Sequence, residues 1–186
     1  MVAQLYMSHP GPLADLPQPT LPPGFSFRPA VDEDAEELAA LVTAAYDPVH
    51  DTPWDGQRIR AELLEAADVL ETWVIVDGGG RIHATASERL LPYIYPGGTG
   101  YVHFVGTLQG SQGLGLGRAV TLRVLHGFVE RGLHRAVLNT ADFRLPAVRL
   151  YLQLGFIPEY REDSERAAWS ALFRHSLMTG SHVLAG

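Results

Sequence analysis

Hydrophobic residues along the chain follow two spacings, the alternating one of strands and the three-to-four-residue one of helices. The first helical stretch begins at Asp32 and Glu33 and extends to about Tyr46, with Leu38 and Leu41 on one face. Three further helices are expected, at 56–67, about 118–131 and about 145–154. Apolar segments with strand character predict seven strands, at 25–28, 72–77, 81–90, 101–108, 134–140, 156–160 and 169–175.

The order of these elements is that of an α/β domain with a mixed sheet. Gly78, Gly79 and Gly80 join the second and third strands through a tight turn, so these two strands should pair as an antiparallel hairpin. The sequence therefore predicts an α/β fold with a mixed, mostly antiparallel central sheet of about seven strands and four helices.

The first 24 residues differ from the rest in composition. They hold six of the 13 prolines and a single charged residue, Asp15. Such a segment is typical of a poorly structured arm or of an extended strap over a domain. We therefore expect a proline-rich arm at 1–24 and one domain at 25–186, with the arm as a candidate contact in a homodimer or as a cover for the site.

Composition excludes several kinds of chemistry. The 186 residues include no cysteine and no lysine, and the formal net charge is −7. Disulfide scaffolds, thiol nucleophiles, Schiff-base lysines and the lysine-dependent phosphate loop are therefore ruled out. An acidic chain is a poor binder of nucleic acid, and no apolar stretch approaches the ~20 residues of a membrane span. We expect a cytoplasmic protein without nucleic-acid or membrane partners.

A glycine-rich segment lies between the strand at 101–108 and the next helix. It reads Gln112-Gly113-Leu114-Gly115-Leu116-Gly117-Arg118. Glycines let the backbone approach a ligand closely, and the free N–H groups at a helix start favour anions. The G-x-G-x-G spacing differs from the G-x-G-x-x-G of dinucleotide-binding folds, so the phosphate belongs to another kind of ligand.

The spacing Q-x-x-G-x-G resembles the acyl-CoA loop of the GCN5-related N-acetyltransferases, the GNAT superfamily. Residues 147–156 are similar to the A-x-x-L-Y-x-x-x-G-F segment of this superfamily, and Val105-Gly106-Thr107 falls where its central strand ends. Residues 142–151 also resemble a mycothiol-synthase-like branch. The resemblance covers about 25–175 and implies the GNAT fold.

The resemblance implies acetyl-CoA as co-substrate and no metal. The backbone of the glycine loop would hold the pyrophosphate, and the pantetheine arm would lie along the strand end. Arg144 stands where many members carry an asparagine and could reach a phosphate. The cofactor-binding candidates are Val105, Gly106, Thr107, Gln112, Gly113, Leu114, Gly115, Leu116, Gly117, Arg118 and Arg144.

Tyr151 occupies the general-acid position of the superfamily, where a phenol would protonate the leaving thiolate. The residues do not decide which group acts as the general base. His103 is the first candidate because strand alternation puts Tyr101, His103, Val105 and Thr107 on one face. Glu88 is the second candidate and Asp142 the third; water without a dedicated base is the remaining alternative.

The resemblance implies that the acceptor is the primary amine of a small molecule. This amine would attack the thioester directly in a ternary complex, because no cysteine can carry the acetyl group. Candidate substrate-binding residues are Tyr46, His50, Asp51, Trp54 and Tyr101. Their aromatic and acidic character would suit a cationic amine. Two alternatives stay open, namely acetylation of a protein or peptide amine and a catalytically weak acyl-CoA-binding sensor domain.

Overall fold

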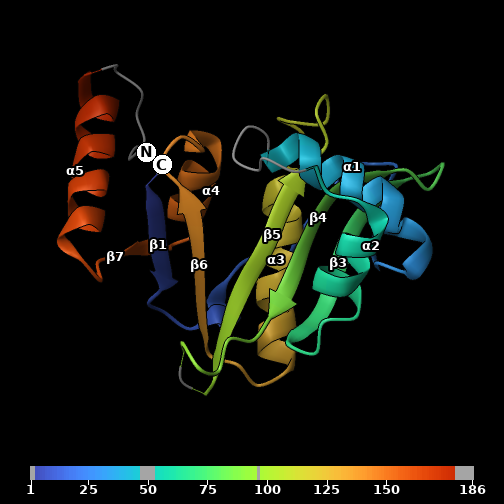
Figure 1. The fold of residues 1–186 in the computed structure, drawn as a ribbon, viewed down its shortest axis with the longest axis horizontal. Helices are drawn as coiled ribbons and strands as arrows, with labels where there is room; N and C mark the ends of the chain where they lie inside the picture. The colour runs from blue at the N-terminus through green and yellow to red at the C-terminus, as the bar shows by residue number, and fades with distance from the viewer. Residues whose placement is uncertain (1–2, 47–52, 96, 179–186) are drawn as a thin grey trace.

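The computed structural model of the chain describes residues 3–46, 53–95 and 97–178 (Figure 1). Seven strands form one sheet in the order β2-β3-β4-β5-β6-β1-β7, and every neighbouring pair is antiparallel except β5 with β6. The strands are β1 (Gln4–His9), β2 (Phe25–Pro29), β3 (Val69–Asp77), β4 (Ile82–Arg89), β5 (Thr99–Thr107), β6 (Arg135–Ala141) and β7 (Ile157–Glu159). The mixed, mostly antiparallel sheet is thus confirmed.

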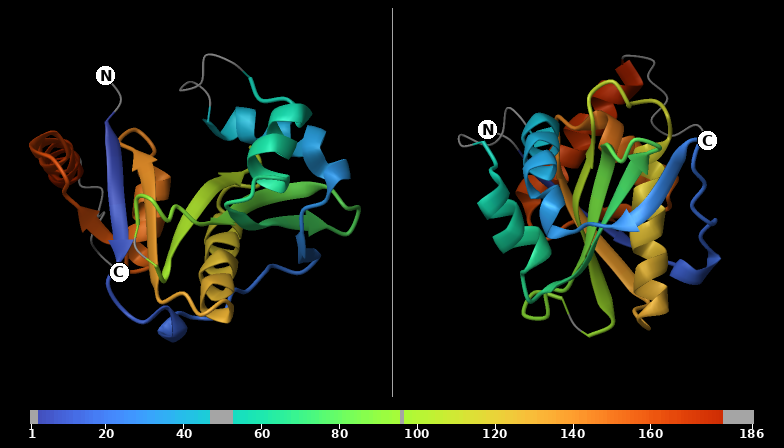
Figure 2. Two further views of the ribbon diagram at one scale, coloured as in Figure 1. Left: turned by 60° about the horizontal axis from the view of Figure 1, so that its bottom comes forward. Right: turned by 90° about the vertical axis from the view of Figure 1, so that its right-hand side faces the viewer.

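Helices cover both faces of this sheet (Figure 2). Helix α1 (Ala35–Tyr46) buries Leu38 and Leu41 against one face, together with α2 (Gly56–Ile59) and the irregular turn η3 (Arg60–Leu64). Helix α3 (Leu116–Glu130) packs on the opposite face, in a second apolar cluster. The apolar periodicity of the α1 segment therefore predicted its buried side correctly.

The sheet is splayed between β5 and β6. Only Thr99, Gly100 and Tyr101 of β5 pair with β6, and beyond Tyr101 the two strands diverge (Figure 1). The second half of β5 consequently keeps a free edge towards β6. Helix α4 (Leu145–Gln153) follows β6 and stands at the wide end of this opening.

The expectation of an arm outside the domain is wrong for residues 4–9. This segment is β1, which pairs with β6 on one side and with β7 on the other. Leu5 and Met7 are fully buried, because alternate residues of the strand face the core. The following proline-rich segment does run as a strap along α3, where the His126 ring donates from Nε2 to the Pro17 carbonyl at 3.0 Å.

The strand predicted at 169–175 is also wrong, since this segment lies within α5 (Asp163–Met178). Trp169 and Leu172 are spaced three residues apart, and both are buried. This spacing is helical, and α5 packs its apolar side beside β1 and β7 (Figure 1). The helix count therefore exceeds the predicted four. Within the described ranges, no helix combines the length and apolar character that crossing a membrane requires.

Candidate active site

A β-bulge interrupts the central strand β5 at Phe104. This residue has a φ of +45°, and the register with β4 shifts between Thr85 and Ser87. Phe104 therefore follows His103 on the α1 face, with the two ring centroids 4.3 Å apart, while Val105 turns towards the α3 face. The prediction that Tyr101, His103, Val105 and Thr107 share one face is wrong, because the extra residue reverses the alternation.

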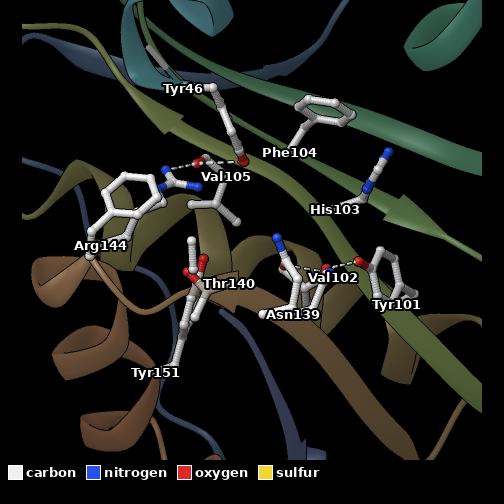
Figure 3. Close-up of a pocket in the computed structure, with 13 residues that line it drawn as sticks. Tyr46, Tyr101, Val102, His103, Phe104, Val105, Asn139, Thr140, Arg144 and Tyr151 are labelled. Atoms are coloured by element: carbon white, nitrogen blue, oxygen red, sulfur yellow. Dashed lines mark hydrogen bonds between the residues drawn. The ribbon is translucent and has the colours of Figure 1, made fainter. Parts of the chain in front are cut away.

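Two cavities open beside the divergent half of β5. The first, here called the strand cavity, measures about 280 Å³ and lies between β5 and β6 (Figure 3). The second, the loop cavity, measures about 540 Å³ and is bounded by the glycine loop and by α4. Val105, Arg144 and Tyr151 line both cavities. A ligand lying in the loop cavity can therefore present its end to a second molecule in the strand cavity.

The backbone that bounds the loop cavity has the conformation expected of an anion-binding site. Gly113 and Gly115 adopt φ values of +82° and +78°, which favour glycine, and Gly115 is the N-cap directly before α3. The free N–H groups of the first turn of α3 therefore adjoin the cavity. Of the predicted cofactor-binding residues, Val105, Thr107, Gln112, Gly113, Gly115, Leu116, Gly117, Arg118 and Arg144 line it, whereas Gly106 and Leu114 do not.

Tyr151 extends from α4 to the junction of the two cavities and is 4% exposed. Burial, with the neighbouring Tyr46, raises the pKa of its phenol well above the usual value, although Arg144 opposes this effect. The phenol therefore keeps its proton at neutral pH and can donate it. This is the state that the predicted general-acid role requires.

Arg144 occupies the same junction. Its Nη2 donates to the Val105 carbonyl at 3.3 Å, and its guanidinium carbon lies 4.1 Å from the centre of the Tyr46 ring. The Tyr46 hydroxyl donates to the same carbonyl at 3.2 Å. Among the described residues, no carboxylate forms an ion pair with Arg144. Its positive charge is thus available to both cavities.

His103 lines the strand cavity but is already paired. Arg89 donates from Nη1 to its Nε2 at 2.8 Å, and Arg89 is itself held by Asp68. Because arginine only donates, the imidazole is neutral with its proton on Nδ1. Burial and the charge of Arg89 lower the pKa of His103 to about 3. Both effects oppose the predicted role of His103 as general base.

A row of polar groups from three strands forms one wall of the strand cavity. The Tyr101 hydroxyl donates to Oδ1 of Asn139, and Asn139 donates from Nδ2 to Oε1 of Gln4 at 3.1 Å. Burial raises the pKa of Tyr101 above its usual value, so this hydroxyl also stays protonated. Gln4 and Asn139 were not among the predicted substrate-binding residues. The alternation around Leu5 and Met7 is the signal that could have placed Gln4 in a strand.

Glu88 is excluded from the site. Its side chain is fully buried on the α3 face, where Oε1 accepts from Trp73 Nε1 at 2.7 Å and Oε2 from Arg131 Nε at 2.8 Å. It fills the space above Gly127, whose missing Cβ would lie 1.9 Å from Oε1. The structure therefore does not bring Glu88, the second base candidate, to the site, because its side chain is buried on the far face and lines neither cavity.

The remaining predicted residues divide into two groups. Tyr46 and Tyr101 line the strand cavity, whereas Trp54 packs edge-to-face on Phe104 with a centroid distance of 4.7 Å and lines neither cavity. His50 and Asp51 lie outside the described residues. Asp142, the third base candidate, lines neither cavity. The described part of the chain contains no group of three histidine or carboxylate side chains able to hold a metal ion.

A splayed sheet with an anion-binding loop at a helix start, and a buried tyrosine where two cavities meet, is the arrangement of a cofactor-dependent transferase. The model of the acetyltransferase (GNAT) family matches residues 35–156, and the chain belongs to this family. Residues outside this match, including β1 and α5, belong to the same structure.

Curated relatives carry the name mycothiol acetyltransferase. One from Pseudarthrobacter chlorophenolicus is 37% identical over 152 residues, which cover 77% of this chain and 46% of the relative. Another from Thermomonospora curvata is 34% identical over 159 residues, covering 82% of this chain and 50% of the relative. The chain thus spans about half the length of these relatives.

Solved structures show the same fold. A GCN5-related N-acetyltransferase from Kribbella flavida is 25% identical, with a TM-score of 0.58 over 85% of this chain and 56% of that one. One from Sphaerobacter thermophilus superposes with a TM-score of 0.63 at 21% identity, over 85% of this chain and 49% of that one. The GNAT fold implied by the sequence motifs is confirmed.

Proposed function

We propose that this chain is an N-acetyltransferase that moves an acetyl group from acetyl-CoA to the primary amine of a small molecule. The single observation that carries the proposal is the sharing of Val105, Arg144 and Tyr151 by the two cavities. A thioester that ends at this junction would meet an amine that enters from the strand cavity. Direct attack in a ternary complex then needs no acyl-enzyme intermediate.

The cofactor would be held mainly by backbone groups. The free N–H groups at the start of α3 suit the pyrophosphate, and Arg118 adds a positive charge. The free edge of β5 after Tyr101 would pair with the amide groups of the pantetheine arm. Because the chain has no lysine, arginine would supply the fixed positive charge for the phosphates.

The reaction would proceed by one displacement. The amine nitrogen attacks the thioester carbon, a C–N bond forms, and the C–S bond breaks as its electron pair leaves on sulfur. Tyr151 would give its proton to this thiolate and regain one from the solvent afterwards. A backbone N–H near the bulge at Phe104 would hold the transient oxyanion, a contribution of about 3 kcal/mol.

Water would remove the proton from the amine. Glu88 and Asp142 line neither cavity, and the lone pair of His103 is occupied by Arg89, so no predicted base is placed to accept it. Among the described residues that line the strand cavity, none is a carboxylate. An amine with a low pKa, present partly as the free base at neutral pH, fits such a site better than a strongly basic one.

The acceptor would be small and polar. The strand cavity is limited to about 280 Å³, and Gln4, Tyr101 and Asn139 present amide and hydroxyl groups to it. The name of the curated relatives, mycothiol acetyltransferase, supports a small-molecule acceptor. These features argue against a protein amine, which needs an open groove.

The test is a thiol-release assay with acetyl-CoA and a panel of amines that differ in pKa and size, with a peptide N-terminus included. We expect turnover with small amines of low pKa and little with the peptide. CoA binding without turnover of any amine would contradict the proposal and favour an acyl-CoA sensor. Preference for the peptide would reverse the assignment of the acceptor.

A further inference from the structure

A row of three polar side chains lies behind the glycine loop, outside the reacting centre. His83 on β4 forms a hydrogen bond through each ring nitrogen. Its Nε2 lies 3.0 Å from Asp77 Oδ2, and its Nδ1 lies 2.7 Å from Ser111 Oγ. Ser111 is 5% exposed and lines the loop cavity next to Gln112 and Gly113. Three separate segments of the chain therefore converge to orient one hydroxyl at the wall of this cavity.

The far end of the row is fixed by the β3–β4 turn. Asp77 uses its other oxygen, Oδ1, to accept from the backbone N–H groups of Gly79 and Arg81 at 2.9 and 3.1 Å. The hydrogen bond from His83 lowers the pKa of Asp77, so the carboxylate is ionised and can only accept. Nε2 of His83 must consequently carry a proton.

The protons in this row determine which way the serine hydroxyl points. With a neutral ring, Nδ1 of His83 has a lone pair, and Ser111 must donate its only proton to it. The lone pairs of Ser111 then face the loop cavity and repel an anion. A phosphate in the cavity has only acceptor atoms, so Ser111 can bind it only after turning its proton outward. That rotation requires a proton on Nδ1, which would then donate to Ser111 Oγ.

We propose that Ser111 is a phosphate ligand for the acyl-CoA co-substrate, and that His83 with Asp77 positions its hydroxyl by taking up one proton as the phosphate binds. The inference rests on the proposed function, because it assumes that the loop cavity holds CoA. The ionised Asp77 at Nε2 stabilises the imidazolium that forms, as does the phosphate beyond Ser111. His83 and Asp77 are positioning residues that act through Ser111.

Few other groups face His83 in the described part of the chain. The Phe25 ring on β2 packs edge-to-face at a centroid distance of 5.1 Å, and Asp77 is the one charged group within ion-pair distance. Arg118, on the first turn of α3, lines the same cavity and would assist the phosphate at every pH. Replacing His83 therefore tests directly whether this ring takes up the proton.

Calorimetric titration of the whole chain with CoA, at pH 7.5 in two buffers of different ionisation enthalpy, tests the proposal. We expect the unmodified chain to take up a substantial fraction of one proton per CoA bound. This proton uptake should disappear in His83→Gln. His134→Gln is the matched control, because this exposed histidine lies next to Gly98 and lines neither cavity. Ser111→Ala should bind CoA at least about ten-fold more weakly, whereas Ser111→Thr should retain most of the affinity. Thermal melting checks that each variant folds.

Repeating the titration with dephospho-CoA distinguishes the pyrophosphate from the 3′-phosphate as the source of the anion. Uptake that persists assigns Ser111 to the pyrophosphate, and uptake that disappears assigns it to the 3′-phosphate. Binding of CoA without proton uptake, or with the same uptake in His83→Gln, would overturn this inference alone. Failure of the unmodified chain to bind CoA would overturn the proposed function and this inference with it.

Discussion

Replacing Glu88 should destabilise the protein and leave catalysis intact. Its carboxylate is fully buried and satisfies two donors, Trp73 Nε1 and Arg131 Nε. Removing one partner of a buried ionic contact typically costs 3–5 kcal/mol, but Arg131 is 42% exposed and can recover hydration. We therefore expect Glu88→Ala to lower the free energy of unfolding by about 3 kcal/mol. Glu88→Gln keeps one acceptor, and its cost should be about 1–2 kcal/mol.

Urea denaturation measures these losses, and thiol release per folded molecule measures activity. A matched control is Glu130→Gln, whose side chain is 60% exposed and pairs with Arg123 on the surface. This control should change stability by less than about 1 kcal/mol. Activity of the Glu88 variants should stay within about three-fold. A fall in kcat of two orders of magnitude without loss of stability would refute the exclusion of Glu88 from the site.

Four other changes have defined outcomes. Tyr151→Phe should lower kcat about 10²–10⁴-fold in the thiol-release assay with little change in the melting temperature. His103→Gln should reduce the loss of stability between pH 7 and pH 5 by about 1–2 kcal/mol in urea denaturation, because the depressed pKa makes the unfolded state bind more protons there. Leu5→Ala should cost about 3 kcal/mol, since the side chain is fully buried in β1. Gly115→Ala should weaken CoA binding in calorimetry, because an L-residue is strained at a φ of +78° by about 1 kcal/mol.

Each of these has a contrary result. An unchanged kcat in Tyr151→Phe would end its assignment as proton donor. An unaltered pH dependence of stability in His103→Gln would mean that the ring takes up its proton equally in the folded and unfolded states. If Leu5→Ala left the free energy of unfolding unchanged, packing of β1 would contribute nothing to the stability of the core. If Gly115→Ala bound CoA as tightly as the unmodified chain, the glycine loop would not be the cofactor-binding element.

The fold around the motifs could be predicted because local signals agreed there. Glycines 113 and 115 do adopt a left-handed backbone that favours glycine, and α3 begins at Leu116, about two residues before the expected start. Tyr151 likewise lies at the cavity junction that the resemblance implied. Short motifs of this kind encode backbone conformation directly, so one sequence suffices to interpret them.

Side-chain direction on β5 could not be predicted. Nothing in the sequence marks Phe104 as a bulged residue, yet its positive φ decides which neighbours face the site. A related reason applies to Glu88 and His103, two of the three base candidates, because each is paired with a residue from elsewhere in the sequence. Arg131 is 43 residues from Glu88, and Arg89 is 14 residues from His103. Such pairing depends on tertiary packing, which periodicity does not specify.

Residues 4–9 were missed because the prolines that follow dominate the composition of the first 24 residues. The strand has consequences for the site as well as for the core. β6 is unpaired on its β5 side beyond Val137, so its backbone there depends on β1 for hydrogen bonds. The same strand contributes Gln4 to the wall of the strand cavity. One strand thus both pairs with the splayed part of β6 and contributes a polar group to the strand cavity. Substitutions in β1 should therefore change acceptor preference and stability together, while those on the outer strand β2 should change stability alone.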